Sequence, residues 1–312
     1  MIEVSHLTKK YGSRLAVDDI SFTVEDGVIY GLLGPNGAGK STIMNILTGY
    51  LAATEGQVTV AGHPLPEEAD AAKACVGYLP EQPPLYPEMT VAEYLDFAAE
   101  LKGVKKADRP AQVQSAARRT GLEDVLPRLI RSLSKGYRQR VGVAQALLGS
   151  PQLIILDEPV SALDVSVQSQ VLNLLLELQE ERKLSYLFIA HDLAVVKHIS
   201  DRVAVMYLGK IVEMSDAETI YRSPKHAYTK ALLDAIPEPD PARANKHQPL
   251  PGDVPSPINP PLGSAFGHRI QHPSYPETVG ADLTPVEIEP GHWVAPDPCS
   301  LEPEDWNKVR QR

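Results

Sequence analysis

The chain has 312 residues, of which 43% are apolar and 22% charged, enough for one large domain or two modest ones. Its 40 acidic and 30 basic residues give a formal charge of −10, which argues against sequence-independent nucleic-acid binding and against adhesion to anionic lipid. Two cysteines, Cys75 and Cys299, are too few for a disulfide scaffold. Neither a secretory signal nor an apolar run of membrane-spanning length is present, so we expect a soluble protein without direct membrane insertion.

The first 223 residues alternate predicted strands and helices, a pattern typical of an α/β domain with a mainly parallel sheet. Residues 2–4 and 16–25 are predicted to form antiparallel strands. The short apolar run Ile29–Leu33 predicts a buried strand, and residues 40–50 predict the helix after it. Residues from about 85 to 150 carry few strand signals and predict an inserted helical subdomain.

A glycine-rich loop joins that strand to that helix. It reads Gly34-Pro35-Asn36-Gly37-Ala38-Gly39-Lys40-Ser41, followed by Thr42, and matches the pattern G-x-x-x-x-G-K-[ST]. Its glycines let backbone N–H groups point at phosphate oxygens, and the helix N-terminus adds positive potential. Lys40 would then reach the β- and γ-phosphates, and the Ser41 hydroxyl would ligate Mg²⁺. The flanking strand and helix favour this nucleotide site over an ordinary glycine-rich turn.

Within the predicted helical subdomain, Ser134 is a candidate N-cap for a helix that runs to Gly149. A second buried strand, residues 153–156, ends in Asp157 and Glu158. Asp157 would hold Mg²⁺, directly or through water, and Glu158 would accept a proton from an attacking water. The alternative is a pair of acids that caps the next turn. The phosphate loop upstream favours the metal and base roles.

Three further elements complete the α/β pattern. Residues 167–182 carry one apolar stripe at helical spacing, formed by Val171, Leu174, Leu175 and Leu178. Residues 186–190 and 203–207 predict two more buried strands.

These motifs resemble the ATP-binding subunit of ABC transporters over roughly residues 1–223. The segment Leu133-Ser134-Lys135-Gly136-Tyr137 is similar to the family's signature loop, Leu-Ser-Gly-Gly-Gln, with Lys135 and Tyr137 as departures. The resemblance implies a P-loop NTPase fold: a RecA-like, mainly parallel sheet core, an antiparallel β subdomain and an inserted helical subdomain. Domain boundaries are then expected at 1–223 for the cassette and 224–312 for a proline-rich C-terminal extension.

The resemblance also implies roles for residues outside the loop. Tyr11 would stack on adenine, and Gln82 would contact Mg²⁺ or the attacking water. His191 would contact the γ-phosphate and orient the water. Ser134 and Gly136 would bind the nucleotide of a second subunit, and Asp164 lies in the loop Ser161-Ala162-Leu163-Asp164 that would cross the dimer interface.

One copy of each motif implies a head-to-tail dimer, homomeric or heteromeric, that closes around ATP and opens on hydrolysis. Its further partners would be integral membrane permease subunits, which would hold it at the inner face of the cell membrane and dock in a groove near Gln82. Residues 1 to about 157 resemble ABC-2 type exporters, and residues from about 158 to 312 resemble oligopeptide importers, so the transport direction stays open. Three other possibilities are a non-transport ABC ATPase, a P-loop kinase and an inactive hybrid chain.

The C-terminal extension holds 17 of the 28 prolines. After Pro237 it is expected to be an extended, irregular tail that either packs on another part of the protein or stays mobile. Many importer tails carry a cysteine cluster for an iron–sulfur centre. Here Ser264, Ile270 and Tyr275 occupy that neighbourhood and only Cys299 lies nearby, so no metal beyond Mg²⁺ is expected. His268, His272 and His292 are predicted to be solvated.

Overall fold

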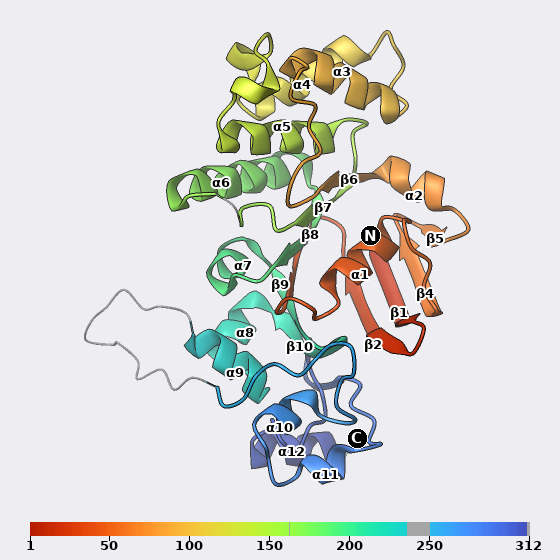
Figure 1. The fold of residues 1–312 in the computed structure, drawn as a ribbon, viewed down its shortest axis with the longest axis vertical. Coiled ribbons are helices and arrows are strands. Elements are labelled where there is room, and N and C mark those ends of the chain that lie inside the picture. The colour runs from red at the N-terminus through yellow and green to blue at the C-terminus, as the bar shows by residue number, and fades with distance from the viewer. Residues whose placement is uncertain (162, 236–249, 311–312) are drawn as a thin grey trace, which may run out of the picture.

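The larger of two sheets forms the centre of the molecule in the computed structural model, which describes residues 1–161, 163–235 and 250–310 (Figure 1). Its strand order is β11-β12-β10-β9-β3-β8-β7-β6. The strands from β9 to β6 are parallel, and β10, β12 and β11 extend the β9 edge in antiparallel fashion. In chain order they are β3 (Ile29–Leu33), β6 (Val76–Leu79), β7 (Leu153–Asp157), β8 (Ser185–Ala190), β9 (Arg202–Tyr207), β10 (Lys210–Asp216), β11 (Val286–Glu289) and β12 (His292–Val294).

The central parallel strands are apolar on both faces because both faces are covered. In β3, Tyr30 and Leu32 join the core on one side of the sheet, and Ile29 and Leu33 join the core on the other. All four buried strands expected from the sequence are confirmed, with ends shifted by no more than one residue.

The smaller sheet is antiparallel and lies beside β3 and α1 (Lys40–Leu47) (Figure 1). It contains β1 (Ile2–Tyr11), β2 (Arg14–Val24), β4 (Glu55–Val60) and β5 (His63–Leu65), in the order β2-β1-β4-β5. The early antiparallel strands are thus confirmed. α2 (Ala69–Cys75) leads from this sheet back to β6.

One face of the larger sheet packs against α1 and the smaller sheet, and helices cover its other face. There α6 (Val165–Arg182) and α7 (Leu193–Ile199) pack with part of α5 (Lys135–Leu147). The Asp164 carboxylate starts α6 by accepting a hydrogen bond from the Val167 N–H at 3.0 Å. The apolar stripe predicted for this helix is buried.

A separate helical region stands at the upper end of the molecule in Figure 1. It contains α3 (Val91–Leu101), α4 (Arg109–Arg119), α5 and the 3₁₀ turns Glu123–Val125 and Ile130–Ser132. These elements share an apolar core of their own. As expected, Ser134 caps α5, its hydroxyl accepting from the Tyr137 N–H at 3.3 Å.

The C-terminal part departs from the sequence expectation. Residues 250–310 are not an irregular tail: they contain the β11–β12 hairpin, and β12 pairs with β10 of the main sheet. The helices of this end are α8 (Ala217–Arg222), α9 (Ala227–Asp234), α10 (Ala265–Arg269), α11 (Tyr275–Thr278) and α12 (Pro303–Arg310). Prolines stand in connections or in first helical turns, where a missing N–H costs little. The proline run at residues 237–242 lies outside the described residues.

Within the described ranges, no helix has the length and apolar character needed to cross a membrane.

Candidate functional site

The phosphate loop lies between the C-terminal end of β3 and the start of α1. Gly37 and Gly39 have φ of +83° and +107°, in the left-handed region that favours glycine. A Cβ on Gly39 would lie 2.7 Å from the Ala16 carbonyl oxygen, so a side chain is excluded there by contact as well. Gly39 is the N-cap residue of α1 and has no side chain that could accept a hydrogen bond from the helix. The first N–H groups of α1 therefore lack a side-chain cap and can bind an anion.

Lys40 is buried beneath this loop. Its Nζ donates to the carbonyl oxygens of Gly34 at 2.5 Å and Pro35 at 3.1 Å. Burial lowers the pKa of Lys40, and the nearby carboxylates of Glu158 and Asp157 oppose that shift. The ammonium is therefore held at the loop and satisfied by carbonyl groups that phosphate oxygens can replace.

The acid pair lies at the C-terminal end of β7, two strands from β3: Asp157 is the last residue of β7, and Glu158 follows it. Glu158 adopts φ of +49°, unusual for a residue with a side chain, and its N–H donates to the Ile189 carbonyl of β8 at 2.9 Å. Its Oε2 lies 2.5 Å from Nδ1 of His191, the residue that follows β8. Because parallel strands end at the same edge, residues 33 positions apart become direct partners.

Asp157 lies half-buried beside this pair. Burial, followed by the neighbouring carboxylates of Glu158 and Glu81, raises the pKa of Asp157 to about 6, while Lys40 opposes the rise. Asp157 thus lies among other carboxyl groups, with only one ammonium group nearby to offset their charge. A bound cation would offset this negative charge.

One cavity of about 340 Å³ brings these groups together. It is lined by the loop residues Pro35, Asn36, Gly37, Gly39, Lys40, Ser41 and Thr42, by Asp157, Glu158 and His191, and by Arg14, Ala16 and Glu81. The sequence reasoning missed the last three. Arg14 pairs with Tyr11 across the β1–β2 hairpin, and its Nε is buried without a hydrogen-bond partner. No motif in the sequence marks Arg14, Ala16 or Glu81.

Other expected site residues lie outside this cavity. Tyr11 is 45% exposed, with Nζ of Lys9 5.4 Å from its ring centroid. Gln82 is exposed, and its neighbour Glu81 lines the cavity instead. Ser134 and Asp164 cap α5 and α6, and neither lines the cavity.

Gly136 has a packing reason to be glycine. A Cβ there would lie 2.6 Å from a Val167 methyl group, so α5 and α6 approach closely at this point. Nearby, the buried Gln139 amide of α5 donates to the Pro159 carbonyl at 2.7 Å. The helix that begins at Ser134 is thereby tied to the turn directly after Glu158. Ala162, in the loop expected to cross a dimer interface, lies outside the described residues.

The C-terminal histidines do not behave alike. His292 is not solvated as expected: it is 1% exposed, and its Nε2 lies 2.8 Å from Oε1 of Glu213, which is fully buried. This pair ties β12 to β10. His268 is exposed, as predicted, whereas His272 is only partly exposed. In the part of the chain that the structure describes, no three His, Cys, Asp or Glu side chains gather as a metal-ligand group.

Comparison with known families finds two matches. Residues 17–161 match the ABC transporter family, and residues 212–272 match the oligopeptide/dipeptide transporter C-terminal region. The second match begins within β10 and ends just after α10.

Individual relatives match nearly the whole chain. YkfD of Bacillus subtilis (strain 168), named as a candidate oligopeptide transport ATP-binding protein, is 42% identical over 95% of this chain and 94% of its own. The oligopeptide transport ATP-binding protein OppF of Salmonella typhimurium is 44% identical over 81% of this chain and 79% of its own. Likeness to peptide transporters is therefore not confined to residues 158–312.

Solved structures share the fold. CbiO1 from Clostridium perfringens, part of an ABC transporter complex, superposes with a TM-score of 0.67 at 26% identity, covering 71% of this chain and 90% of its own. A dimeric ATP-binding cassette in a post-hydrolysis state with ADP and Pi gives a TM-score of 0.62 at 25% identity, covering 70% and 99%. The expected P-loop NTPase fold is confirmed, and the chain belongs to the ATP-binding subunits of ABC transporters, in the group of the oligopeptide/dipeptide transporters.

Proposed function

We propose that this chain hydrolyses ATP to ADP and phosphate at the cavity of the phosphate loop and thereby powers the import of peptides through a membrane permease. The names of its relatives, which refer to oligopeptide transport and peptide import, support the direction and the class of cargo. These names favour import over export, the direction suggested by the resemblance of residues 1–157 to ABC-2 type exporters.

The observation that carries this proposal is the pairing of Glu158 with His191 at the cavity that Lys40 also lines. Glu158 would take the proton of the attacking water, a role that general bases fill with a rate effect of about 10²- to 10⁴-fold. His191 would orient that carboxylate and contact the γ-phosphate. Lys40 and the N–H groups at the start of α1 would hold the phosphates in place.

The donor set fits ATP with Mg²⁺. The uncapped start of α1 and the unpartnered Nε of Arg14 are donors that suit phosphate or ribose oxygens. The Ser41 hydroxyl and the Asp157 carboxylate are oxygen ligands of the kind that Mg²⁺ prefers. When bound, Mg²⁺ supplies charge neutralisation on the phosphate oxygens. Gln82 would complete the ligand set after a shift of its loop, and Tyr11 would stack on adenine.

A second copy or homologue would complete the site. Ser134, Gly136 and Asp164 all lie outside this chain's own cavity, as a head-to-tail arrangement requires. The likeness to a cassette described as dimeric with ADP and Pi supports this arrangement. ATP would then hold two subunits together, and hydrolysis would release them.

The permease would dock in a second cavity, of about 680 Å³, between α2, α3 and β6. Its lining includes Tyr86, Phe97 and Leu101, and Leu101 is 72% exposed, a large apolar surface for an uncovered site. Tyr86 follows Gln82 by four residues, which agrees with the groove expected near Gln82. This contact would hold the chain at the inner face of the cell membrane.

We also propose the division into a cassette at 1–223, with helices at about 85–150, and an extension at 224–312. The separate apolar core of α3, α4 and α5 supports the helical subdomain. Tyr228 and Phe266 of the extension join the core of the main sheet, so the extension packs on the cassette.

The test is reconstitution of the chain with its candidate permease subunits in lipid vesicles. We expect ATPase activity that depends on Mg²⁺ and rises when the permease subunits and peptide are supplied. An ATPase activity that is the same with and without the permease subunits would favour a non-transport ABC ATPase. Phosphate transfer to an acceptor other than water would favour a kinase.

A further inference from the structure

A proline-rich connection links α9 to α10 in the C-terminal extension, and residues 250–262 of it are described. We call these thirteen residues the proline strap; they include Pro251, Pro255, Pro257, Pro260 and Pro261. Each proline ring fixes φ and removes a backbone donor, so the strap has few conformations open to it. A stiff segment of this kind can transmit a contact from one part of a protein to another.

The strap reaches the phosphate loop. A Cβ built on Gly37 would lie 3.3 Å from Cγ of Pro257 and 3.6 Å from its Cβ. The ring of Pro257 therefore covers the loop where Gly37 adopts its φ of +83° and leaves little room for even a methyl group. Pro257 does not line the nucleotide cavity, so it supports the loop from outside the place where phosphates would bind.

The extension, rather than the cassette, fixes the position of this ring. Before Pro257, the Gly252 carbonyl accepts a hydrogen bond from Nε of Arg269 at 3.2 Å. After it, the Leu262 carbonyl accepts from the Tyr275 hydroxyl at 2.8 Å. Around it, the Ile258 N–H donates to the Ser256 hydroxyl at 3.2 Å and closes a local turn. The strap is thus anchored to the region of α10 and α11.

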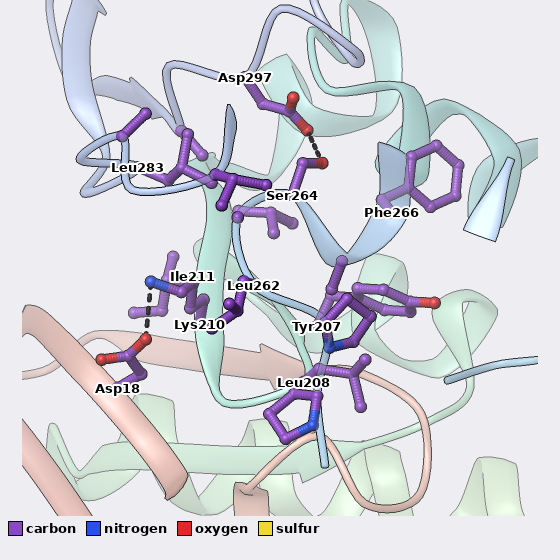
Figure 2. Close-up of a pocket in the computed structure, with 18 of the residues that line it drawn as sticks. Asp18, Tyr207, Leu208, Lys210, Ile211, Leu262, Ser264, Phe266, Leu283 and Asp297 are labelled. Carbon is purple, nitrogen blue, oxygen red and sulfur yellow. Dashed lines mark hydrogen bonds and ion pairs between the residues drawn. The ribbon is translucent and has the colours of Figure 1, made fainter. Parts of the chain in front are cut away.

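Between these anchors the strap borders a cavity instead of resting on a packed core. Figure 2 shows this cavity, of about 390 Å³, which is lined by Leu262 together with Tyr207, Leu208 and Ile211. Pro260 and Pro261 line it as well, and Leu262 is 73% exposed. Since the side chains of Ile258 and Leu262 in this half of the strap are mostly exposed, its position depends on its anchors and on the contact at Gly37.

The phosphate loop also has a second support. Gly209, next to Leu208 in the β9–β10 turn, donates its N–H to the Ala38 carbonyl at 2.9 Å. This support belongs to the cassette fold itself. The strap adds a contact that a cassette without the extension would lack.

We propose that Pro257 is a positioning residue: the proline strap holds the phosphate loop in its nucleotide-accepting conformation and so couples the C-terminal extension to nucleotide binding. A loop with two left-handed glycines has much conformational freedom to lose when it closes on phosphates. A contact that restricts it beforehand lowers the cost of binding. By reciprocity, bound nucleotide must steady the strap by the same factor. This inference rests on the proposed nucleotide site.

The first experiment measures affinity of the full-length chain for a fluorescent N-methylanthraniloyl ADP. Pro257→Gly removes the ring and frees the backbone, and we expect about three- to tenfold weaker binding, the effect of losing one or two buried methylene contacts. Ile258→Ala is the matched control, because its side chain is 60% exposed in the same turn, and it should bind within twofold of wild type. Pro257→Val restores apolar bulk and should recover most of the affinity.

The second experiment follows hydrogen exchange of the strap in the full-length wild-type chain and in Pro257→Gly. Saturating ADP should slow exchange of the Ser256 and Ile258 amides, and Pro257→Gly should abolish that protection while the protection of α1 remains. A merely structural role for Pro257 would lower thermal stability without linking strap exchange to ADP. Unchanged or tighter ADP binding by Pro257→Gly, or strap amides indifferent to ADP in wild type, would overturn the proposal. If wild type fails to bind the nucleotide at all, the proposed function itself is at fault.

Discussion

Asp157 at the nucleotide cavity and Asp297 in the C-terminal extension are both acids withdrawn from water, yet their pKa values move in opposite directions. Burial and the carboxylates of Glu158 and Glu81 raise the pKa of Asp157 to about 6. Burial also acts to raise the pKa of Asp297, but the His226 imidazole and the hydroxyls of Ser264 and Ser300 outweigh it, so this pKa falls well below its usual range.

The hydrogen bonds explain the contrast. Oδ2 of Asp297 accepts from Ser264 at 2.5 Å and from Ser300 at 2.6 Å, while Oδ1 accepts from the Cys299 N–H at 2.9 Å. Around Asp157 the neighbours are other acids and a lysine bonded elsewhere. The extension therefore contains a completed polar network that holds structure, whereas the cavity contains an incomplete one that a cation would satisfy.

The largest expected effect tests the incomplete site. Glu158→Gln keeps the shape of the side chain but removes the base, so turnover should fall by about 10²- to 10⁴-fold. Nucleotide should still bind, because Lys40 and the loop are unchanged. Phosphate release measures the turnover, and light scattering under saturating Mg·ATP measures the dimer that this variant should trap.

Glu81→Gln is the matched control for that variant, since Glu81 lines the same cavity but does not contact His191. Its turnover should stay within about tenfold of wild type. A Glu158→Gln chain that hydrolyses ATP at the normal rate would remove Glu158 from the base role.

The second effect tests the completed network. Asp297→Asn replaces one acceptor oxygen with a donor that faces the Ser264 and Ser300 hydroxyls, so the free energy of unfolding should fall by about 3 kcal/mol. Asp234→Asn, at an exposed position at the end of α9, should change it by less than about 0.5 kcal/mol. Urea unfolding measures both. Equal stability of the two variants would mean that the network contributes nothing net.

The third effect returns to the cavity. Lys40→Ala removes a buried ammonium that should contact the phosphates, and loss of such charge-assisted hydrogen bonds should weaken nucleotide binding by about tenfold to a hundredfold. Titration with fluorescent ADP measures the change. Lys210→Ala is the control. The Nζ of Lys210 lies 2.7 Å from Oδ2 of Asp18, and neither residue lines the nucleotide cavity. Equal affinities in the two variants would place the phosphates elsewhere.

The sequence predicted the cassette well because its signals are local. Strand Ile29–Leu33, the loop after it and the capped helix at Ser134 each follow from a short run of residues. The convergence of Lys40, Asp157 and His191 in one cavity also agrees with the edge geometry of parallel strands. Arg14 and Glu81 escaped notice because they belong to no motif, and only the fold brings them to the cavity.

The extension was predicted poorly because its stability depends on distant contacts. His292 looks like any exposed histidine until Glu213, 79 residues earlier, is placed beside it. Proline density suggested irregular chain, but β12 gains its order by pairing with β10. Local propensity cannot reveal a strand that an existing sheet edge stabilises.

The smallest effect is a pH dependence at the cavity. Because the pKa of Asp157 is raised from 3.8 to about 6, the nucleotide-free folded chain keeps a proton that the unfolded chain releases, and this group's contribution to stability declines as pH rises toward 6. Mg²⁺ requires the ionised carboxylate. Affinity for Mg·ADP should therefore rise by about fourfold between pH 5.5 and 7.5 and then level off, the change in ionised fraction for a pKa of about 6.

Fluorescent ADP titrated in the presence of Mg²⁺ at each pH measures this rise. The phosphates of ADP titrate in the same range, so the informative quantity is the difference from Asp157→Asn, which keeps the side-chain shape but has no proton to lose. A rise of equal size in both proteins would assign the whole effect to the nucleotide. A steeper rise in affinity for the wild-type chain would show that Asp157 must lose its proton before the cavity binds Mg²⁺. Asp297 differs, because its hydrogen-bond partners are already in place.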